Sequence, residues 1–489
     1  MNRPLRKVAV ACVVLFGLLL LQANWVQVVK AKSYRDDPRN RRVLLRTYDR
    51  QRGAIVLGTG PDRQAVATSV PTRDTLKYLR TYPGGAVYAP ITGFYSLVYG
   101  RTGIERLQDR VLSGDDDRLF VRRLSDYVTG RAPAGGSIVL TLDRAAQQAA
   151  YDGLAGKVGA VVALDPRTGA VLAMASRPSY DPTGLSSHDP SQIRSSYKAL
   201  SAADGSPLTN RAVESLYPPG STFKVITTAA ALASGRYTPA TRVPSPTRLT
   251  LPQTTATLGN FGGETCGDGK TDTLADALAI SCNTAYGALG MALGQDAVRR
   301  QAEAFGFGSA DLSLPQPVAD SVYPDNLTPP QVAQAAIGQF DVRVTPLEMA
   351  MVAAGVAHHG EVMQPYLVQE VQAPDLSQLD VAQPRVLSRA VSAAVADQLS
   401  VMMQGVVTGG TGKAAQLPGV AVAGKTGTAQ HGAGAAPHAW FIGFAPANDP
   451  KVAVAVLVED GGNAGSEATG GRVAAPIARA VMQAVLSRR

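Results

Sequence analysis

The chain has 489 residues and a formal net charge of +9, with 45% hydrophobic and 17% charged residues. This length allows more than one domain with a sizeable core, and this composition excludes an intrinsically disordered chain. Aromatic residues make up 6% of the sequence, too few for the stacking surfaces that bind single-stranded nucleic acid. The modest basic excess favours an acidic wall or a membrane surface as partner, and we expect no nucleic acid.

The first thirty residues predict a membrane anchor. Three basic residues (Arg3, Arg6 and Lys7) precede an apolar segment at 8–29, which is long enough to cross a bilayer. Positive charge before such a segment predicts a cytoplasmic N-terminus and an extracytoplasmic remainder in a single-pass protein. A cleaved signal peptide is the alternative, with Ala31-Lys32-Ser33 as a weak candidate cleavage site.

The rest of the chain divides into two parts that differ in residue composition and in predicted secondary structure. Residues 35–52 are basic and polar, and residues 53–135 mix short β-like runs with turns and show no catalytic pattern. A Gly-, Ala- and Pro-containing stretch at 130–136 is the expected linker. We therefore expect a cytoplasmic tip and anchor over 1–33, a spacer or dimerisation-like domain over 34–136, and a catalytic domain over 137–489.

The expected catalytic domain has strands at both ends and helices between them. The sequence predicts a strand at 137–142, a helix capped by Asp143 that extends to 154, and a hairpin formed by 159–164 and 170–175. A mainly helical, Ala-rich region follows at 196–360. Strands return at 420–429, 438–445 and 452–459, before a last amphipathic helix at 472–486. This order predicts an α+β domain whose sheet contains strands from both ends.

A serine and a lysine lie at the start of the most apolar helical segment. A Pro-Pro-Gly turn at 218–220 leads to Ser221, and helical spacing makes Ser221 and Lys224 neighbours on one face. A lysine in apolar surroundings loses part of its preference for the charged form, so it can take a proton from a hydroxyl and create a nucleophile. The alternative is an N-cap serine beside a lysine that extends into water.

A second pair with the same spacing provides an internal comparison. Ser195 and Lys198 are also three residues apart, but no Pro-Gly turn precedes them and no long apolar run follows. We expect that pair to lie on a solvated helix face.

Two short motifs follow Ser221 in the chain. Ser281-Cys282-Asn283 stands at the expected end of a helix that begins near Thr271, and Lys425-Thr426-Gly427-Thr428 ends an apolar run. Alone, the first would be a helix C-cap and the second a turn at the end of a strand. The three motifs together, in this order, supply the parts that acyl transfer needs.

Each motif residue has an expected role in that chemistry. Ser221 attacks, Lys224 accepts its proton, Ser281 passes a proton to the leaving amine, and Asn283 holds Lys224 and the substrate backbone. Lys425 supplies positive charge, the Thr426 and Thr428 hydroxyls bind a substrate carboxylate, and Gly427 lets the substrate backbone lie close to the strand. The backbone N–H groups of Ser221 and Thr428 form the oxyanion hole.

The three motifs resemble those of the penicillin-binding protein and serine β-lactamase superfamily. Within this superfamily the chain most resembles the class B penicillin-binding proteins, and its length and expected anchor most resemble the division-associated actinobacterial members. Five further segments carry the resemblance to class B: Arg52-Gly53-Ala54-Ile55, Asn210-Arg211-Ala212, Gly338-Gln339, Thr345-Pro346-Leu347-Glu348-Met349-Ala350 and His438-Ala439-Trp440-Phe441. Three departures are Cys282 in the middle motif, where family members vary, Phe340 in place of the last glycine of Gly-Gln-Gly, and His359-Gly360 in place of Asn-Gly. None of them touches an expected catalytic position.

The resemblance implies a fold and an activity. The fold is a helical subdomain with an antiparallel sheet flanked by helices. The activity is that of a D,D-transpeptidase, which cross-links D-Ala-D-Ala stem peptides of peptidoglycan through a serine acyl-enzyme and is acylated by β-lactam antibiotics. It implies a role in wall synthesis during growth and division, with no cofactor and no metal. A membrane glycan polymerase and other division proteins are the expected partners, because the chain lacks a glycan-synthesising domain.

Cys266 and Cys282 would both lie outside the cell, where disulfides persist. They are close in sequence and flank a short polar turn, so we expect them to pair. Two unpaired buried thiols are the alternative. Closure of so short a loop would contribute about 3 kcal/mol in the chain-entropy description.

Four rival functions remain possible at this point. A secreted β-lactamase would need a water-activating Glu, and none occurs between Glu303 and Glu348. A D,D-carboxypeptidase would differ only in accepting water. A bifunctional glycosyltransferase lacks the chain length before the catalytic domain. A catalytically inactive sensor would bind β-lactams or muropeptides without turnover.

Two other motif candidates are weak. The Gly-rich segment at 409–413 lacks the first glycine and the final Ser or Thr of a phosphate loop, because Val407 and Ala414 stand there. The five histidines show no metal-ligand spacing beyond the adjacent pair His358 and His359. His431 and His438 flank the Gly-rich turn after the Lys-Thr-Gly strand, so either is a candidate to line the cleft.

Overall fold

The structure is a computed structural model that describes residues 3–30, 33–34, 48–119, 128–130, 132, 134–309, 312–314, 316–432 and 434–487. Several sequence-based expectations lie outside the described residues. They are most of the basic run at 35–52, positions 131 and 133 of the expected linker, and residues 31 and 32 of the candidate cleavage site.

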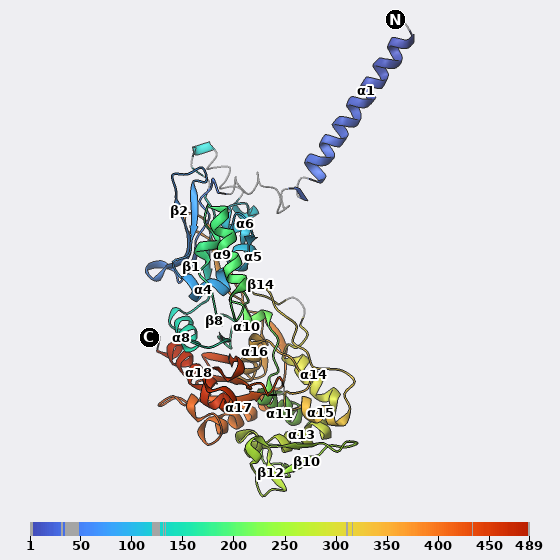
Figure 1. Cartoon of the computed structure of the whole chain (residues 1–489), viewed down its shortest axis with the longest axis vertical. Coiled ribbons are helices and arrows are strands. Elements are labelled where there is room, and N and C mark those ends of the chain that lie inside the picture. The colour runs from blue at the N-terminus through green and yellow to red at the C-terminus, as the bar shows by residue number, and fades with distance from the viewer. Residues whose placement is uncertain are drawn as a thin grey trace.

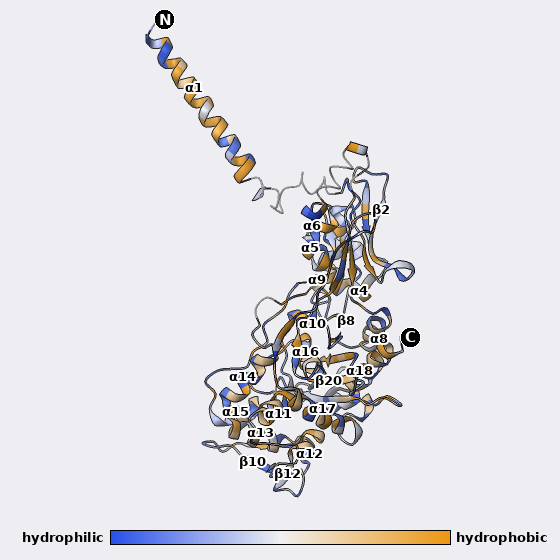
Figure 2. Cartoon of the chain, turned by 180° about the vertical axis from the view of Figure 1, so that it is seen from behind, coloured by the Kyte–Doolittle hydropathy of each residue, from blue (hydrophilic) through white to orange (hydrophobic). Residues whose placement is uncertain are grey.

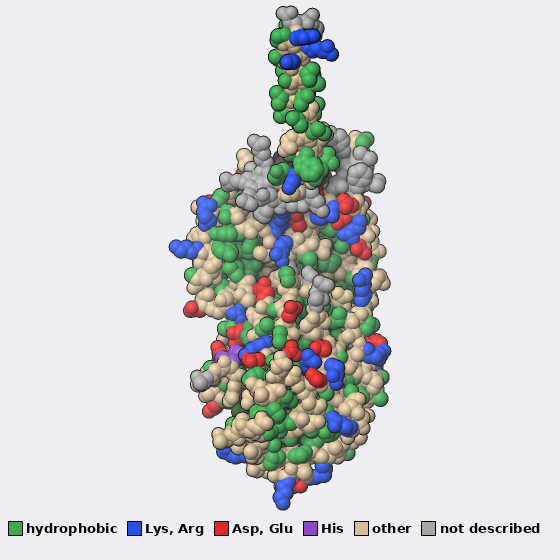
Figure 3. All heavy atoms as spheres, turned by 90° about the vertical axis from the view of Figure 1, so that its right-hand side faces the viewer, with side chains coloured by type: hydrophobic (Ala, Val, Ile, Leu, Met, Phe, Trp, Pro, Cys, Tyr) green, Lys and Arg blue, Asp and Glu red, His purple; other side chains and the backbone are tan. Residues whose placement is uncertain are grey.

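The N-terminal helix stands apart from the rest of the chain (Figure 1). α1 (Arg3–Asn24) continues into a π-helical turn, η1 (Trp25–Val29). Its surface is mostly apolar, with basic side chains in its first turn (Figures 2 and 3). Within the part of the chain that the structure describes, this is the one helix long and apolar enough to cross a membrane. It is consistent with a membrane anchor or a signal sequence.

The part of the chain after α1 and η1 is built on a six-stranded sheet in the order β17-β16-β6-β1-β2-β3. The strands are β1 (Ile55–Leu57), β2 (Gln64–Pro71), β3 (Tyr78–Thr81), β6 (Ser137–Leu140), β16 (Val368–Gln372) and β17 (Gln378–Val381). β6 pairs in parallel with β1 and antiparallel with β16. This sheet therefore continues across the expected boundary at 136, and the domain limits stay a prediction.

Short helices and one further strand pair complete this part. They are η2 (Gly60–Asp62), α4 (Gly85–Thr92), β4 (Tyr95–Ser96), β5 (Gly100–Arg101), α5 (Gly103–Leu107), α6 (Asp109–Leu112) and η3 (Asp117–Leu119).

The expected catalytic domain contains a second, five-stranded antiparallel sheet with the strand order β19-β20-β21-β7-β8. Its strands are β7 (Gly159–Leu164), β8 (Val171–Arg177), β19 (Ala423–Ala429), β20 (His438–Ala445) and β21 (Val452–Val458). The prediction that strands from both ends share one sheet is confirmed. β19 forms one edge of this sheet.

Helices cover both faces of the five-stranded sheet. Val161 and Ala163 of β7 pack with α8 (Arg144–Gly153) and α18 (Gly470–Leu486), because strand side chains alternate between faces. Ala160 and Val162 lie in the core that contains α16 (Pro346–Ala357). Burial on both faces explains why these strands are apolar throughout instead of alternating.

The helical region lies at the end of the molecule away from α1 (Figure 1). Its main helices are α12 (Leu274–Ala279), α13 (Asn283–Leu293), α14 (Gln295–Phe305), α15 (Pro329–Ala335) and α17 (Ala393–Thr408). α10 (Arg211–Glu214) packs against α16 and the five-stranded sheet, whereas η4 (Pro182–Leu185) and α9 (Pro190–Ala202) lie beside α4 in the part nearer α1 (Figure 1). On α9, Ser195 and Lys198 are exposed, so the solvated face expected for that pair is confirmed.

Short strand pairs interrupt the region at 196–360 that the sequence predicted as mainly helical, and a further pair follows it. Inside the region are β9 (Arg242–Pro244) with β12 (Thr271–Thr273), β10 (Arg248–Thr250) with β11 (Thr257–Gly259), and β13 (Ser313–Leu314) with β14 (Gln316–Pro317). After it comes β15 (Glu361–Met363) with β18 (Val386–Arg389). Strands of two to four residues are too short to show an alternating pattern, so the sequence did not predict them.

Candidate active site

The expected nucleophile lies on a tight turn beside the edge strand β19. Ser221 belongs to η5 (Gly220–Phe223), and Lys224 begins α11 (Lys224–Ala233). Gly220 has a φ of +53°, and a Cβ there would lie 2.9 Å from the carbonyl oxygen of Thr428. Glycine is therefore needed both for the backbone conformation and for the close approach to β19. This contact brings Ser221 next to the Lys-Thr-Gly segment.

The amine of Lys224 is fully buried among neutral groups. It donates to the carbonyl oxygen of Ser281 at 2.6 Å and to Asn283 Oδ1 at 2.7 Å, and the ring of Tyr286 lies 5.4 Å away. Burial, and then the positive charge of Lys425, hold the pKa of Lys224 well below its usual value. In the described part of the chain, Lys224 makes no hydrogen bond to the Ser221 hydroxyl.

A second buried lysine, Lys425, reaches Ser281 from the five-stranded sheet. The amine of Lys425 on β19 donates to Ser281 Oγ at 2.8 Å and to its neighbour's carbonyl, Thr426 O, at 2.9 Å. Burial lowers the pKa of Lys425 to about 7. Ser281 Oγ is also 3.3 Å from the amine of Lys224. Two amines of depressed pKa therefore meet at one hydroxyl, which is the arrangement a proton relay requires.

Ser281 lies between two helices and not at the end of one. The sequence placed the Ser-x-Asn motif at the close of a helix that begins near Thr271, and this was wrong in detail. α12 ends at Ala279, and Asn283 is the first residue of α13. Ser281 has a φ of +66°, which is unusual for a residue with a side chain. The kink turns both its carbonyl and its hydroxyl toward the lysines.

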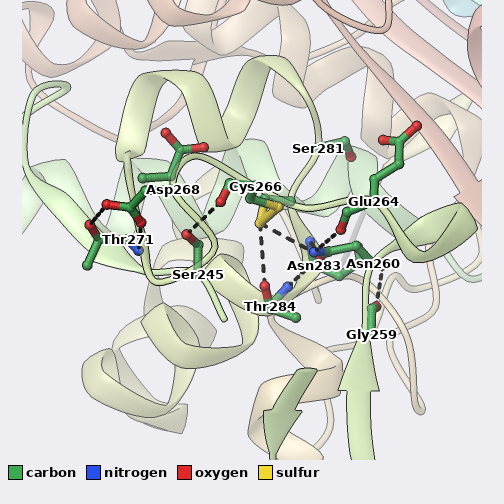
Figure 4. The surroundings of a disulfide bond; sticks show 12 residues. Ser245, Gly259, Asn260, Glu264, Cys266, Asp268, Thr271, Ser281, Asn283 and Thr284 are labelled. Atoms are coloured by element: carbon green, nitrogen blue, oxygen red, sulfur yellow. Dashed lines mark hydrogen bonds between the residues drawn. A yellow bond between two sulfur atoms is a disulfide. The ribbon is translucent and has the colours of Figure 1, made fainter. Parts of the chain in front are cut away.

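Asn260 and a disulfide surround the start of α13 (Figure 4). Asn260 Oδ1 accepts from the backbone N–H groups of Asn283 at 2.9 Å and Thr284 at 3.0 Å. It therefore caps this helix from a distant loop, because Cys282 at the N-cap position gives no side-chain cap. Cys266 and Cys282 form a disulfide. These contacts fix the backbone on both sides of the Ser281–Asn283 turn.

The strand that carries the third motif presents its free edge to η5. β19 pairs with β20 along its whole length, from Ala423 opposite Phe444 to Ala429 opposite His438. Thr426 is buried and Thr428 partly so. A Cβ at Gly427 would lie 3.1 Å from the carbonyl oxygen of Pro219. Small residues here keep η5 and the strand edge close together.

Two histidines and an aspartate gather at the end of β19. His431 and His438 stack at 3.8 Å, and His431 Nε2 lies 2.8 Å from Asp460 Oδ1. The three could hold a metal by type and proximity, which the sequence spacing did not predict. However, parallel stacked rings do not direct their lone pairs at one point. His438 Nδ1 also already accepts from the backbone N–H of Asp460. The arrangement is a hydrogen-bonded cluster that ties the turn after β19 to the segment after β21.

Comparison with known proteins agrees with this geometry. Residues 159–483 match the family described as "Penicillin binding protein transpeptidase domain", and residues 52–138 match the "Penicillin binding protein A dimerisation domain". The chain belongs to the penicillin-binding protein family. It is 49% identical to the peptidoglycan D,D-transpeptidase PbpA of Mycolicibacterium smegmatis and 48% identical to PbpA of Mycobacterium tuberculosis, in both cases over 99% of each chain.

Solved structures of a relative carry bound antibiotics. This penicillin-binding protein is similar to the ceftriaxone acyl-enzyme complex of penicillin-binding protein A from M. tuberculosis, with a TM-score of 0.87, 46% identity, and coverage of 91% of this chain and 100% of that one. The penicillin G acyl-enzyme complex of the same relative gives a TM-score of 0.85 and 47% identity, over 90% and 100% of the two chains.

Several residues that support the site of this penicillin-binding protein were not predicted as site residues. Trp440 Nε1 donates to the carbonyl of Pro218 at 3.0 Å and so holds the turn before Ser221. Tyr217 OH donates to Glu459 Oε1 at 2.6 Å, and Arg211 Nε donates to the same oxygen at 2.8 Å. Trp440 and Arg211 fall in segments that carried the family resemblance, and Tyr217 directly precedes the Pro-Pro-Gly turn. Asn260 had no sequence signal, because its partners lie more than twenty residues away.

Proposed function

We propose that the chain is a peptidoglycan D,D-transpeptidase that forms its acyl-enzyme on Ser221 and is acylated there by β-lactams. The observation that carries this proposal is the meeting of Lys224 and Lys425 at Ser281, directly beside the turn that holds Ser221. Two buried amines with depressed pKa at one hydroxyl are costly for a fold, and they fit a site built to move protons.

The acylation step uses these groups in order. Lys224 accepts the hydroxyl proton of Ser221, and the oxygen attacks the carbonyl carbon of the penultimate D-Ala of a stem peptide. The backbone N–H groups of Ser221 and Thr428 stabilise the oxyanion that forms. As the tetrahedral intermediate collapses, Ser281 passes a proton to the nitrogen of the terminal D-Ala, which leaves. The amine of a second stem peptide then attacks the ester and restores the Ser221 hydroxyl.

The third motif holds the substrate during this sequence. Lys425 supplies a positive charge close to the terminal carboxylate, and the hydroxyls of Thr426 and Thr428 donate to it. Asn283 holds Lys224 through Oδ1, as in the structure, and contacts the substrate backbone. Gly427 leaves room for that backbone against the strand edge. The disulfide of Cys266 and Cys282 supports the turn that positions Ser281 and Asn283.

Intact mass after exposure to benzylpenicillin tests the nucleophile. The soluble part without α1 gains one benzylpenicilloyl group, and Ser221→Ala gains none. Ser195→Ala is the matched control, because Ser195 has the same spacing to a lysine but is exposed on α9. An adduct on Ser221→Ala would assign the nucleophile to another residue. No adduct on the wild type would leave an inactive sensor as the better description.

Turnover of a D-Ala-D-Ala stem peptide separates the remaining alternatives. A transpeptidase transfers the acyl group to an added amine acceptor, whereas a D,D-carboxypeptidase releases the shortened peptide whether or not an acceptor is present. Rapid loss of the benzylpenicilloyl adduct would indicate a β-lactamase. We expect a long-lived adduct and acceptor-dependent product.

The anchor and the domain limits complete the proposal. α1 crosses the membrane once with Arg3, Arg6 and Lys7 on the cytoplasmic side, so the catalytic part is extracytoplasmic. Residues 1–33, 34–136 and 137–489 act as anchor, docking domain and transpeptidase domain. A membrane glycan polymerase and other division proteins are the proposed partners. To test the topology, protease added to spheroplasts should digest the catalytic part. To test the partner, affinity purification of the chain should recover a glycan polymerase, and its absence would contradict the proposal.

A further inference from the structure

The Gly-rich segment after α17 lies between the second and third catalytic motifs. Its sequence does not fit a phosphate loop, and the proposed mechanism does not use it. In the structure, the backbone N–H of Thr411 donates to the carbonyl of Ala279 at 3.2 Å, two residues before Ser281. The Thr411 hydroxyl lies 2.6 Å from the hydroxyl of Thr426 on β19. Thr411 therefore contacts the third motif directly, and it contacts the end of α12 just before the second motif.

Close packing fixes the position of this segment. A Cβ on Gly410 would lie 2.1 Å from the carbonyl oxygen of Ala279, and a Cβ on Gly471 would lie 2.4 Å from the carbonyl oxygen of Thr411. Gly412 N–H donates to the carbonyl of Val406 at 2.9 Å. The segment is held between α12 and the start of α18, so the Thr411 hydroxyl has a defined place beside Thr426.

The direction of the Thr411–Thr426 hydrogen bond matters for substrate binding. Each hydroxyl has one hydrogen to donate, and either oxygen can accept. If Thr426 donates to the substrate carboxylate, its hydrogen is used, and Thr411 must be the donor within the pair. A donated hydrogen bond from Thr411 also polarises the Thr426 hydroxyl and strengthens its own donation to an anion.

We propose that Thr411 is a positioning residue for substrate recognition: its hydroxyl donates to Thr426 and directs the Thr426 hydrogen to the substrate carboxylate. The inference rests on the proposed function, since it assumes that Thr426 binds that carboxylate. It extends the anchor for the carboxylate beyond the Lys-Thr-Gly-Thr motif to a loop that lies between two motifs. Thr411 itself is exposed, so its substitution does not remove a buried packing contact.

The test compares an acidic β-lactam with its neutral ester. The second-order acylation rate constant is measured for benzylpenicillin and for benzylpenicillin methyl ester, with the wild type, Thr411→Val and Thr411→Ser. Thr408→Val is the matched control, because the Thr408 hydroxyl at the end of α17 bonds the carbonyl of Gln404 and not a motif residue. Rates are normalised to active enzyme by titration, and thermal unfolding checks each variant for folding.

We expect Thr411→Val to reduce the ratio of the acylation rate constants for benzylpenicillin and its neutral methyl ester. Thr411→Val should lower the rate constant for the acid by about 3- to 10-fold, the effect of one lost hydrogen bond to a group that binds an anion. The ester rate should stay within about 2-fold, and Thr411→Ser should restore the wild-type ratio. Equal losses for acid and ester, or no loss for either, would overturn the proposal and leave Thr411 with a structural role only. A wild type that forms no adduct would overturn the proposed function itself and this inference with it.

Discussion

Two clusters of buried cations in this molecule are built in opposite ways. In the N-terminal part, Arg52 and Arg80 each donate to Glu105 at 2.6 Å, and Arg52 also donates to Asp109 at 2.8 Å. In the catalytic part, Lys224 and Lys425 donate only to hydroxyl, amide and carbonyl oxygens in the described structure. Arginines meet carboxylates in one cluster, and lysines meet neutral groups in the other.

The difference in partners separates a structural role from a chemical one. Burial alone would raise the pKa of Glu105, but the charges and hydrogen bonds of Arg80 and Arg52 outweigh it and leave that pKa below its usual value. These three charges therefore persist and, together with Asp109 of α6, hold the sheet to α5 and α6. Without a carboxylate, burial instead lowers the pKa of both lysines. The first cluster stays ionised at neutral pH, whereas the second can exchange protons.

Removal of Lys224 should have the largest effect on activity. Lys224→Met keeps most of the side-chain volume and removes the base, so the benzylpenicillin acylation rate should fall by about 10²- to 10⁴-fold. Stability should change by no more than about 2 kcal/mol, because the loss of hydrogen bonds is offset by the removal of an uncompensated buried amine. Lys198→Met on α9 is the control and should change neither quantity. If Lys224→Met is acylated at the wild-type rate, Lys224 is not the base that activates Ser221.

Removal of Glu105 should have the opposite pattern. Glu105→Gln leaves two buried arginines with one carboxylate, and this should destabilise the protein by about 3–5 kcal/mol in urea unfolding. The acylation rate per folded molecule should stay within about 2-fold, because Glu105 lies on α5, in the part built on the six-stranded sheet and away from the three motifs. Asp380→Asn breaks an exposed pair with Arg118 and should cost no more than about 1 kcal/mol. If Glu105→Gln acylates slowly while remaining folded, the two clusters are coupled and the contrast between them fails.

The pH dependence of acylation should report Lys425. With a pKa of about 7, Lys425 is charged below that pH and neutral above it. The second-order rate constant for benzylpenicillin, which reflects the free enzyme, should therefore fall above about pH 7, approaching 10-fold per pH unit. Its methyl ester should not show the fall. Lys425→Arg keeps its charge throughout and should move the decline out of the measured range. A flat profile from pH 6 to 9 for the wild type would contradict this role.

The sequence was sufficient to locate the strands of the five-stranded sheet and to single out the three motifs, because these depend on local residue types. Apolar runs at 159–164, 438–445 and 452–459 became β7, β20 and β21. The capping role of Asp143 is also confirmed, since its side chain accepts from the N–H of Ala146. Such features need only neighbours in sequence.

What the sequence could not give depends on contacts between distant segments. Asn260 caps α13 from a loop more than twenty residues away, and Thr411 meets Thr426 from a loop that looked like a failed motif. The left-handed conformation of Ser281 follows from the way α12 and α13 pack around it, and no residue type signals it. The pairing of β6 with β1 also joins a strand of the expected catalytic domain to the sheet before it.

The buried carboxyl group of Glu348 tests whether a shifted pKa alone indicates a functional residue. Glu348 on α16 is buried, its Oε1 has no hydrogen-bond partner among the described residues, and burial raises its pKa to about 8. The folded protein thus holds a proton that the unfolded chain loses near pH 4.5, so stability should decline as the pH rises from about 4.5 to 8. Glu348→Gln removes this dependence. Its gain over the wild type should be near zero at pH 4.5 and reach about 4 kcal/mol at pH 8, with acylation unchanged. A gain that does not grow with pH would show that Glu348 is ionised in the fold, and a loss of acylation would tie it to the site after all.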